Sequence, residues 1–310
     1  MKGHHVRNTA FFLGKGGVGK TTVSAAFALE LAKRGKRVLA VSLDPAHNLG
    51  DALGVALTDR PKPAAPGLSA MEVDLGAWVE RYLEESRSEL KATYAYNSSF
   101  NLDSFFDIMR YSPGTEEYAV LWAIEHVHCE LSADFDVVVF DTPPTALSLR
   151  FLALPTISGL WVRELTKLRE RILEKRQVVT RLNPESPTAA SCVDKDDDRV
   201  YGKLSAISRR LGVLHRLFAE ESFLSVIVNP DVLSVSEALR IKDELDRIGI
   251  GLHAACLNKR GVSTASWRLD DGLRKLPFFE LDFKSEGIRS LDDLARVDAT
   301  ALAAEFLGGE

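Results

Sequence analysis

Cysteine is scarce in this sequence, and its few copies are scattered. The three cysteines, Cys129, Cys192 and Cys256, lie far apart, and no C-x-x-C pair occurs. A structural zinc site needs clustered ligands and a disulfide framework needs several pairable cysteines, so neither is indicated. This usage is typical of a reducing compartment, and we expect a cytoplasmic protein.

Long apolar runs and excess positive charge are also absent. No run of 18 apolar residues occurs, and the first residues, MKGHHVRNT, lack the apolar core of a signal peptide. We therefore expect neither export nor a transmembrane segment of the chain's own. The formal net charge of −5 argues against a surface devoted to nucleic acid, so no nucleic-acid partner is expected.

The apolar residues that are present form short runs. Their share of 45% over 310 residues is enough for a full core. Runs of the kind that form strands buried on both faces lie at residues 9–13, 38–43, 68–73, 137–140, 224–228 and 252–257. Helical apolar spacing between several of these runs predicts parallel strands with right-handed crossovers. We expect a single α/β domain over residues 1–310, with a mostly parallel, doubly wound sheet.

A glycine-rich loop lies where the first strand meets the first helix. It reads Gly14-Lys15-Gly16-Gly17-Val18-Gly19-Lys20-Thr21-Thr22 and fits the phosphate-loop pattern G-x-x-x-x-G-K-[ST]. Glycines allow backbone N–H groups to converge, and the helix directs the positive end of its dipole to the same point. We predict an ATP site in which Lys20 reaches the phosphates and Thr21 ligates Mg²⁺. The alternative is a glycine-rich turn with a chance lysine.

Two aspartates follow buried strand signals. Asp44 comes directly after residues 38–43, and a carboxylate there is placed to orient or deprotonate the water that attacks the γ-phosphate. The alternative is a helix N-cap before Pro45. Asp141 ends the run 137–140, as an aspartate that holds Mg²⁺ directly or through water does. The carboxyl ends of parallel strands lie at one edge, so both aspartates are expected beside the loop.

The extra lysine of the loop, Lys15, narrows the range of phosphate-loop proteins that the sequence resembles. With it, the loop resembles the deviant Walker A loop of the superfamily that contains the arsenite-pump ATPases. The segments 44–51 (DPAHNLGD) and 141–155 (DTPPTALSLRFLALP) resemble switch I and switch II of the ArsA-type ATPases. That family includes the ATPase that drives the arsenite pump and the guided-entry ATPase that delivers tail-anchored membrane proteins. The resemblance implies a P-loop NTPase fold, ATP and Mg²⁺ as cofactors, and a homodimer.

The resemblance also implies roles for individual residues. Asp44 matches the aspartate that activates water, Thr21 the Mg²⁺ ligand and Asp141 the switch II aspartate. Lys15 matches the lysine that reaches the nucleotide of the partner subunit. Asn258 corresponds to the asparagine that reads adenine, and Pro277 to the loop that packs on the base. Independently of any family, an asparagine after a parallel strand offers the donor and acceptor that read a purine edge.

Two segments have the polar, helical texture of insertions, at about residues 75–131 and 156–222. We expect them to form a helical subdomain on the core. In the second, Trp161, Leu165, Leu168 and Ile172 share a helical face, and charged residues crowd the others. This face either receives an apolar helix or a membrane-facing partner, or it packs within its own subdomain.

Two local clusters invite other readings. His126, His128 and Cys129 are candidate metal ligands, but side chains two apart on a helix diverge, which favours a structural role. The acidic segment 194–198 (DKDDD) does not have the spacing of an EF-hand, so we expect a solvated loop.

Three functions fit the sequence. In the first, a nucleotide-gated homodimer couples ATP hydrolysis to the targeting of tail-anchored membrane proteins, with an apolar client helix as partner. In the second, the dimer drives a membrane efflux partner for arsenite or another anion. In the third, the chain is a regulatory nucleotide switch with slow hydrolysis, which Asp44 and Asp141 disfavour. No C-x-x-C zinc clasp is present, and only Met1, Met71 and Met109 are available for a methionine-rich client groove.

Overall fold

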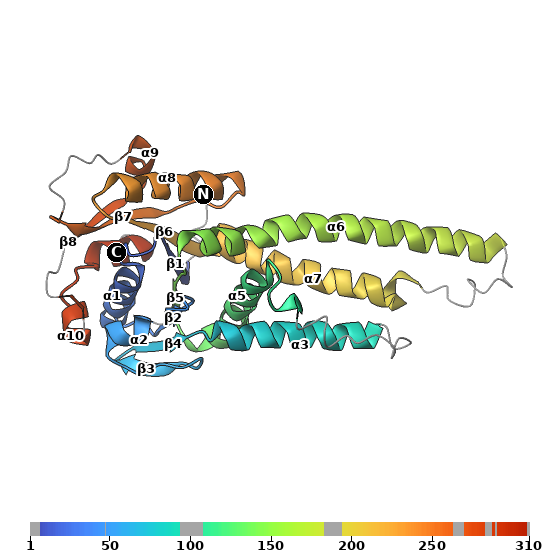
Figure 1. Cartoon of the computed structure of the whole chain (residues 1–310), viewed down its shortest axis with the longest axis horizontal. Coiled ribbons are helices and arrows are strands. Elements are labelled where there is room, and N and C mark those ends of the chain that lie inside the picture. The colour runs from blue at the N-terminus through green and yellow to red at the C-terminus, as the bar shows by residue number, and fades with distance from the viewer. Residues whose placement is uncertain are drawn as a thin grey trace.

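An eight-stranded sheet forms the centre of the protein, with strand order β3-β4-β2-β5-β1-β6-β7-β8 (Figure 1). The computed structural model describes residues 7–46, 48–93, 108–182, 194–262, 270–282, 287–288 and 290–308, with backbone alone at 89–93. All pairings are parallel except that between β3 and β4. The strands are β1 Thr9–Leu13, β2 Val38–Ser42, β3 Lys62–Ala65, β4 Leu68–Glu72, β5 Val137–Asp141, β6 Ser222–Val228, β7 Ala254–Arg260 and β8 Phe278–Asp282.

Helices cover both faces of the sheet, as the doubly wound prediction requires. Successive side chains of a strand point to opposite faces, and in β1 they enter two separate cores. Phe11 stacks on Phe140 with ring centroids 4.6 Å apart in one core, while Phe12 meets Phe27 at 5.1 Å in the other. Strands buried on both faces explain why the sequence shows continuous apolar runs rather than alternation. The predicted α/β fold class is confirmed.

The two layers of helices come from different parts of the chain. The core around Phe12 is covered by α1 Lys20–Lys33 and by α10 Leu291–Leu294 and α11 Thr300–Phe306, with α2 Asn48–Leu53 beside them. The core around Phe11 is covered by α5 Thr115–His126, the first turns of α6 Thr145–Leu182, and α8 Val232–Arg247. A short helix, α9 Asp271–Arg274, precedes β8. The remaining short helical segments are Val127–Leu131, Ser132–Asp134, Lys195–Asp197 and Leu217–Glu221.

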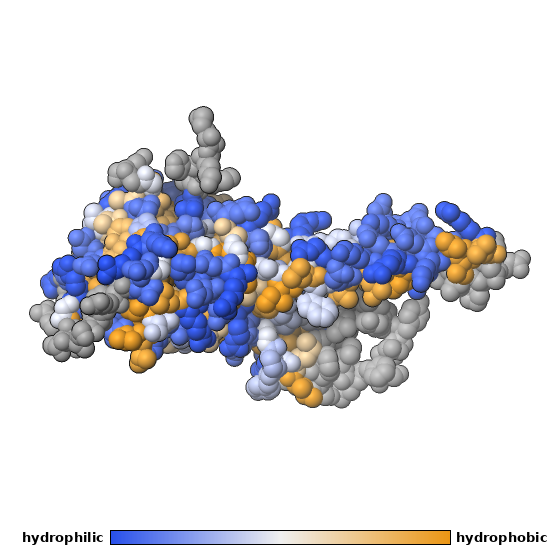
Figure 2. Space-filling model, turned by 90° about the horizontal axis from the view of Figure 1, so that it is seen from above, coloured by the Kyte–Doolittle hydropathy of each residue, from blue (hydrophilic) through white to orange (hydrophobic). Residues whose placement is uncertain are grey.

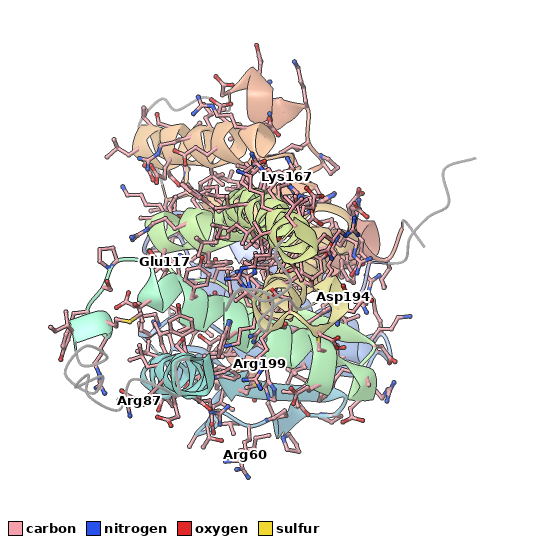
Figure 3. All side chains as sticks on the ribbon, turned by 90° about the vertical axis from the view of Figure 1, so that its right-hand side faces the viewer. Arg60, Arg87, Glu117, Lys167, Asp194 and Arg199 are labelled. Atoms are coloured by element: carbon pink, nitrogen blue, oxygen red, sulfur yellow. The ribbon has the colours of Figure 1, made fainter. Side chains whose placement is uncertain are left out.

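Three long helices extend from one end of the sheet as an arm. They are α3 Leu75–Thr93, α6 and α7 Arg199–Arg216. In Figure 1, α6 and α7 run side by side, and α3 runs along them with α5 in between. Figure 3 looks along the arm from its far end, with Arg87 of α3 and Lys167 of α6 on opposite sides of the bundle. The helices α3 and α7 fall within the two predicted insertions, whereas α6 begins before the second of them.

The helix α6 begins earlier than the predicted second insertion. That insertion was placed from residue 156, but α6 starts at Thr145 and continues through Pro155 to Leu182 over 38 residues. The predicted boundary follows from the resemblance of residues 141–155 to switch II, and Pro155 removes one backbone donor of the helix without ending it. Burial of Phe151, Leu152 and Pro155 holds this part of the helix in place. The helix therefore runs without interruption from the end of the switch II loop to the far end of the arm.

An ion pair ties the two long helices of the arm together. Arg169 of α6 donates to both carboxylate oxygens of Asp198, at 2.9 and 2.6 Å. Asp198 also accepts from the backbone N–H of Tyr201 at 2.7 Å and so caps α7. The expectation of a solvated acidic loop is wrong at Asp198, which is buried. Its two roles explain the burial, since a carboxylate leaves water only when it is paired and hydrogen-bonded.

By length and composition, α6 is the one helix in the described ranges that could cross a membrane. Its most apolar window is 39% buried inside the protein. That window contains Leu149, Phe151 and Leu152, which belong to the core beside the sheet. Part of the apolar content of α6 is therefore explained by its packing against the core of this protein.

Candidate functional site

The predicted phosphate loop follows β1 at the carboxyl edge of the sheet. Gly14 has φ +149°, and a Cβ there would lie 2.6 Å from the backbone oxygen of Ile227 in β6. Gly19 has φ +93°, and a Cβ there would overlap the side-chain amide of Asn258. Two of the pattern glycines are thus required by the close approach of β6 and β7 to the loop. The fold brings the loop into contact with three strands.

Side-chain donors hold four carbonyls of the loop. The Lys20 ammonium donates to the oxygens of Gly14 at 3.1 Å and Lys15 at 3.3 Å. Two side chains of β7 bind the next carbonyls, those of Gly17 and Val18. In the described residues, the N–H groups of Gly17, Gly19 and Lys20 donate to no backbone carbonyl. Converging N–H groups with their carbonyls turned away form a concave anion site.

Asn258 and Lys259 supply the two bonds from β7. Asn258 Nδ2 donates to the Val18 oxygen at 2.8 Å, and its Oδ1 accepts from the Lys259 backbone N–H at 2.9 Å. Lys259 Nζ donates to the Gly17 oxygen at 3.0 Å. Asn258 keeps a second amide proton and a second oxygen lone pair, so its predicted role in reading adenine remains a prediction. Its structural role is to brace the loop.

Thr21 and Asp141 meet beside the loop, as predicted for a magnesium site. The Thr21 hydroxyl donates to Asp141 Oδ2 at 2.6 Å. Asp141 Oδ1 is buried with no hydrogen-bond partner in the described part of the chain. An orphaned carboxylate oxygen beside a hydroxyl is a hard-oxygen donor set of the kind that Mg²⁺ prefers. The residues present therefore fit the metal that the family implies.

The charges of the site are strongly coupled. The pKa of Asp141 is raised to about 7, mainly by burial and in part by the negative charge of Asp44, against the hydrogen bond of Thr21 and the charge of Lys20. Burial lowers the pKa of Lys20, while the charges of Asp141 and Asp44 raise it. A buried cation and two acids in mutual range form a site prepared for a ligand with both phosphate charge and a metal.

Asp44 lies at the end of β2, half-buried. Its Oδ1 accepts from the backbone N–H of Ala46 at 3.0 Å, which closes a local turn before α2. No other described residue donates to this carboxylate. The alternative of a local capping role thus accounts for one oxygen, and the second remains available for water. His47, three residues after Asp44, lies outside the described residues.

Lys15 differs from Lys20 in its exposure to solvent. Lys15 is exposed, and so are the neighbouring Gly16 and Gly17. The side chain of Lys20, five residues on, is buried. The two lysines of the loop therefore have different environments, one inside the site and one on its outer surface. Thr22 lies in the first turn of α1, next to Thr21.

Pro277 is not brought to the site, and this prediction needs correction. Pro277 precedes β8, and its oxygen accepts from the backbone N–H of Ala255 at the start of β7. Parallel pairing of Ala255 with Phe278 places Pro277 at the amino edge of the sheet, opposite the phosphate loop. The carboxyl end of β8 is Asp282, and residues 283–286 that follow it are not described. The strand β8 was not recognised in the sequence, so its two ends were not distinguished.

The candidate metal ligands at the end of α5 do not form a site. His126 pairs with Glu130 at 3.0 Å, and His128 lies 3.9 Å from Glu221. Burial lowers the pKa of His128. No group of three or more metal-ligating side chains occurs within the described ranges. Cys192, which precedes the acidic segment 194–198, lies outside those ranges.

Two residues of the site were missed in the sequence. Asn229 follows β6 and has a buried Oδ1 with no hydrogen-bond partner among the described residues. Lys259 follows Asn258 and binds the loop. The available signal was the position of each polar residue directly after a buried parallel strand. Lys259 gave no further signal, because regular alternation would point its side chain away from that of Asn258.

A second surface of note lies on α6, in the arm. Trp161 is 70% exposed, Leu165 46% and Leu168 49%, and Ile157 continues the same line one turn earlier. The opposite side of α6 buries Val162 and Leu173. Figure 2 shows hydrophobic atoms along the arm and at its far end within a largely hydrophilic surface. The predicted apolar face of this helix is therefore exposed in the single chain, with Ile172 partly buried at its end.

Comparison with known proteins gives the same answer as the geometry of the loop. The family model described as "Anion-transporting ATPase" matches residues 7–266. An arsenical pump-driving ATPase of Aquifex aeolicus is 29% identical over 249 residues, which cover 80% of this chain and 79% of that protein. The ATPase get3 of Schizosaccharomyces japonicus is 30% identical over 256 residues, 80% of this chain and 73% of that protein. The ATPase get3 of Schizosaccharomyces pombe is 30% identical over 257 residues, 80% and 72%.

The family match spans the phosphate loop, both switch segments and the end of β7. The resemblance seen in these motifs is thereby confirmed, and so is the prediction of an ATP-hydrolysing enzyme. Nucleotide binding follows from the same match, and the loop with its inward N–H groups is where the structure provides for phosphate. The chain belongs to the anion-transporting ATPase family, the ArsA-type ATPases.

Proposed function

We propose that this protein is a nucleotide-gated, Mg²⁺-dependent homodimer that couples ATP hydrolysis to the targeting of tail-anchored membrane proteins. The observation that carries the proposal is the exposed apolar line Ile157, Trp161, Leu165 and Leu168 on α6. Exposed apolar residues in a continuous line are typical of an interaction site. Two of the relatives are named ATPase get3, which supports a client of this kind.

The chemistry assigned to the ATP site uses four side chains. Lys20 leaves the carbonyls of Gly14 and Lys15 to bind phosphate oxygens as a point charge. Thr21 and Asp141 hold Mg²⁺, which when bound neutralises phosphate charge. Asp44 accepts a proton from the attacking water through the oxygen that its local turn leaves available.

Lys15 supplies the argument for two subunits. It is exposed beside a loop whose inner cation is already Lys20. In the homodimer we propose, Lys15 reaches the nucleotide of the partner subunit, so that hydrolysis depends on the paired state. The sequence has no C-x-x-C clasp, and the nucleotide itself supplies part of the contact between subunits.

The client proposal is tested by co-expression with a tagged protein that ends in a single apolar helix. We expect the two proteins to co-purify in the absence of membranes, and Trp161→Glu with Leu165→Glu to abolish the complex while ATP hydrolysis continues. Val178→Glu, also on the exposed surface of α6, is the matched control for added charge. Equal recovery of the client with the double variant and the wild type would refute the proposed surface.

The second candidate, the driving subunit of an arsenite or anion efflux pump, is favoured by the name of the Aquifex aeolicus relative. In the described ranges the two cysteines, Cys129 and Cys256, are both free, and Cys256 is buried in β7. Stimulation of ATP turnover by arsenite would favour this candidate over client targeting. A regulatory switch, the third candidate, predicts tight ATP binding with negligible turnover in the presence of an apolar client.

A further inference from the structure

Lys259 has a backbone conformation that its residue type does not favour. Its φ is +58°, and it is the one residue other than glycine with positive φ in the described part of the chain. The left-handed region is disfavoured for a residue with a Cβ, because the Cβ comes too close to the following carbonyl oxygen. Such a conformation persists only where the surroundings enforce it, and it concentrates at functional sites.

The local geometry explains what the unusual conformation achieves. Pairing between β7 and β8 shifts register between Leu257 and Arg260, so Lys259 lies within an irregularity of the strand. In a regular strand, Asn258 and Lys259 would point to opposite faces. Here both side chains reach the phosphate loop, Asn258 at the Val18 oxygen and Lys259 at the Gly17 oxygen. Irregularities of this kind re-aim side chains beside active sites.

The two bonds act on consecutive carbonyls of the loop. A peptide plane whose oxygen is held on one side presents the following N–H on the other. Fixing the Gly17 oxygen therefore fixes the Val18 N–H, which donates to the Lys15 oxygen at 3.4 Å and closes the turn of the loop. Fixing the Val18 oxygen fixes the Gly19 N–H, which donates to no backbone carbonyl among the described residues. The Lys20 ammonium holds the Gly14 and Lys15 oxygens in the same manner. On nucleotide binding Lys20 turns to phosphate, whereas Lys259 can keep its bond.

We infer that Lys259 is a positioning residue of the ATP site, which holds the phosphate loop in its binding shape through the Gly17 carbonyl. Its ammonium binds the loop and not the adenine base. A loop that already has its binding conformation binds phosphate without a free-energy cost for ordering the loop. The inference depends on ATP binding by the chain and is independent of the client proposed above.

The adjacent cation provides a matched control. Arg260 pairs with Glu280 at 2.8 Å and with Asp282 at 2.7 Å, so its charge is directed to β8 and away from the loop. Arg260→Met thus removes a cation from the same turn without removing a bond to the loop. Lys259→Met removes the ammonium and keeps most of the stem. Lys259→Gly removes the bond and also relieves the left-handed strain.

The experiment measures the affinities for MgATP, MgADP and inorganic tripolyphosphate by titration calorimetry, together with steady-state hydrolysis. We expect Lys259→Met to bind all three about tenfold more weakly, the loss typical of a hydrogen bond to a charged group. KM for ATP should rise with kcat within about twofold, because the loop binds substrate and transition state alike. Arg260→Met should resemble the wild type, and Lys259→Arg should recover part of the loss.

Lys259→Gly separates positioning from folding. Urea unfolding without nucleotide should show this variant to be at least as stable as the wild type, while its nucleotide affinity falls as in Lys259→Met. Wild-type affinity in both variants would overturn the inference. So would a loss confined to ATP and ADP with tripolyphosphate unchanged, since that result would place Lys259 on the nucleoside, and so would a fall in kcat with KM unchanged.

Discussion

Asp44 and Asp141 are both acids at strand ends, but their surroundings differ. Asp141 is buried, bonded to the Thr21 hydroxyl, and its pKa is raised to about 7. Asp44 is half-buried, and among the described residues only the Ala46 N–H donates to its carboxylate, at one oxygen. A buried acid with one orphaned oxygen suits a metal, whereas an acid open to solvent can meet a water.

The assignment of Asp44 predicts a variant that binds but does not turn over. Asp44→Asn keeps the acceptor for the Ala46 N–H and removes the base, so ATP affinity should stay within about threefold while kcat falls at least 100-fold, the usual range for loss of a general base. Binding is measured with a fluorescent ATP analogue and hydrolysis by phosphate release. Asp59→Asn, an exposed acid in the following loop, is the control. Hydrolysis at the wild-type rate by Asp44→Asn would exclude the role of base.

His253 provides a test of stability against pH. It lies between β6 and β7, where Nδ1 accepts from the Leu224 N–H at 3.1 Å and the ring stacks on Phe223. Burial and, to a smaller extent, the charge of Arg7 lower its pKa from 6.5 to about 4. Below pH 6.5 the unfolded chain takes up a proton that the folded chain refuses, so the free energy of unfolding falls as pH drops from 6.5 towards 4.

The size of this effect is limited by the partial exposure of the ring. We expect the free energy of unfolding to fall by about 1–2 kcal/mol between pH 7 and 4.5, beyond the change in His253→Gln, whose amide can accept the same N–H and does not titrate. Urea unfolding at both pH values gives the difference. Parallel pH dependence of the two proteins would mean that His253 protonates freely in the folded state.

At the scale of elements, the arm depends on the join between α6 and α7. Asp198 accepts two bonds from Arg169 and caps α7. Asp198→Ala leaves the guanidinium without its partner and the first turn of α7 without its cap, and we expect a loss of about 2–3 kcal/mol. Hydrogen exchange should show it first in the amides of α7.

A surface pair in the same helix is the control for this prediction. Lys167 and Glu164 form an exposed ion pair at 2.7 Å, and such pairs contribute little because water screens them. Glu164→Gln should leave exchange in α7 unchanged. If Asp198→Ala also left hydrogen exchange in α7 unchanged, the join between α6 and α7 would depend on apolar packing alone.

The elements differ in how well the sequence predicts them. Strands β1, β2 and β5 were predicted because burial on both faces makes them continuously apolar. Strands β3 and β8 were missed because they lie at the two edges of the sheet, carry exposed residues, and lack that signal. Missing β8 produced the error at Pro277. The start of α6 was missed because residues 141–155 were assigned to switch II by resemblance, whereas burial of Phe151, Leu152 and Pro155 holds residues from Thr145 in the helix.

At the scale of the whole molecule, the proposed dimer makes a complementation prediction. If Lys15 acts on the partner's nucleotide, Lys15→Ala and Asp44→Asn homodimers are both inactive. A mixed dimer has one site with Asp44 and a partner's Lys15, so it should show about half of the wild-type turnover per dimer. Mixed dimers are isolated with a different tag on each subunit, and ATP hydrolysis is then measured.

The same preparation distinguishes the alternative. Were Lys15 to act within its own subunit, neither site of the mixed dimer would contain both residues, and turnover would stay at the background of the parent variants. Lys36→Ala in place of Lys15→Ala is the control for loss of a surface cation. Lys36 follows α1 and lies outside the loop.

The site residues that could be predicted are those marked by a pattern in the neighbouring sequence. The loop, Asp44 and Asp141 are each marked by a buried strand followed by a characteristic residue, and parallel topology brings such ends together. The brace formed by Lys259 depends on a register shift between β7 and β8, which no local pattern encodes. The exposure of Trp161 likewise depends on which face of α6 meets α7, and the sequence left both readings open.

The continuity of α6 has a mechanical consequence. The helix starts four residues after Asp141 and is about 57 Å long at 1.5 Å per residue. A rigid rod pivoting at its base by about 10° moves its far end by about 10 Å, while residues near the pivot shift by less than a typical bond length. A small rotation of α6 near Asp141, too small to disturb the sheet, would thus produce a large displacement of the helix end at Leu182.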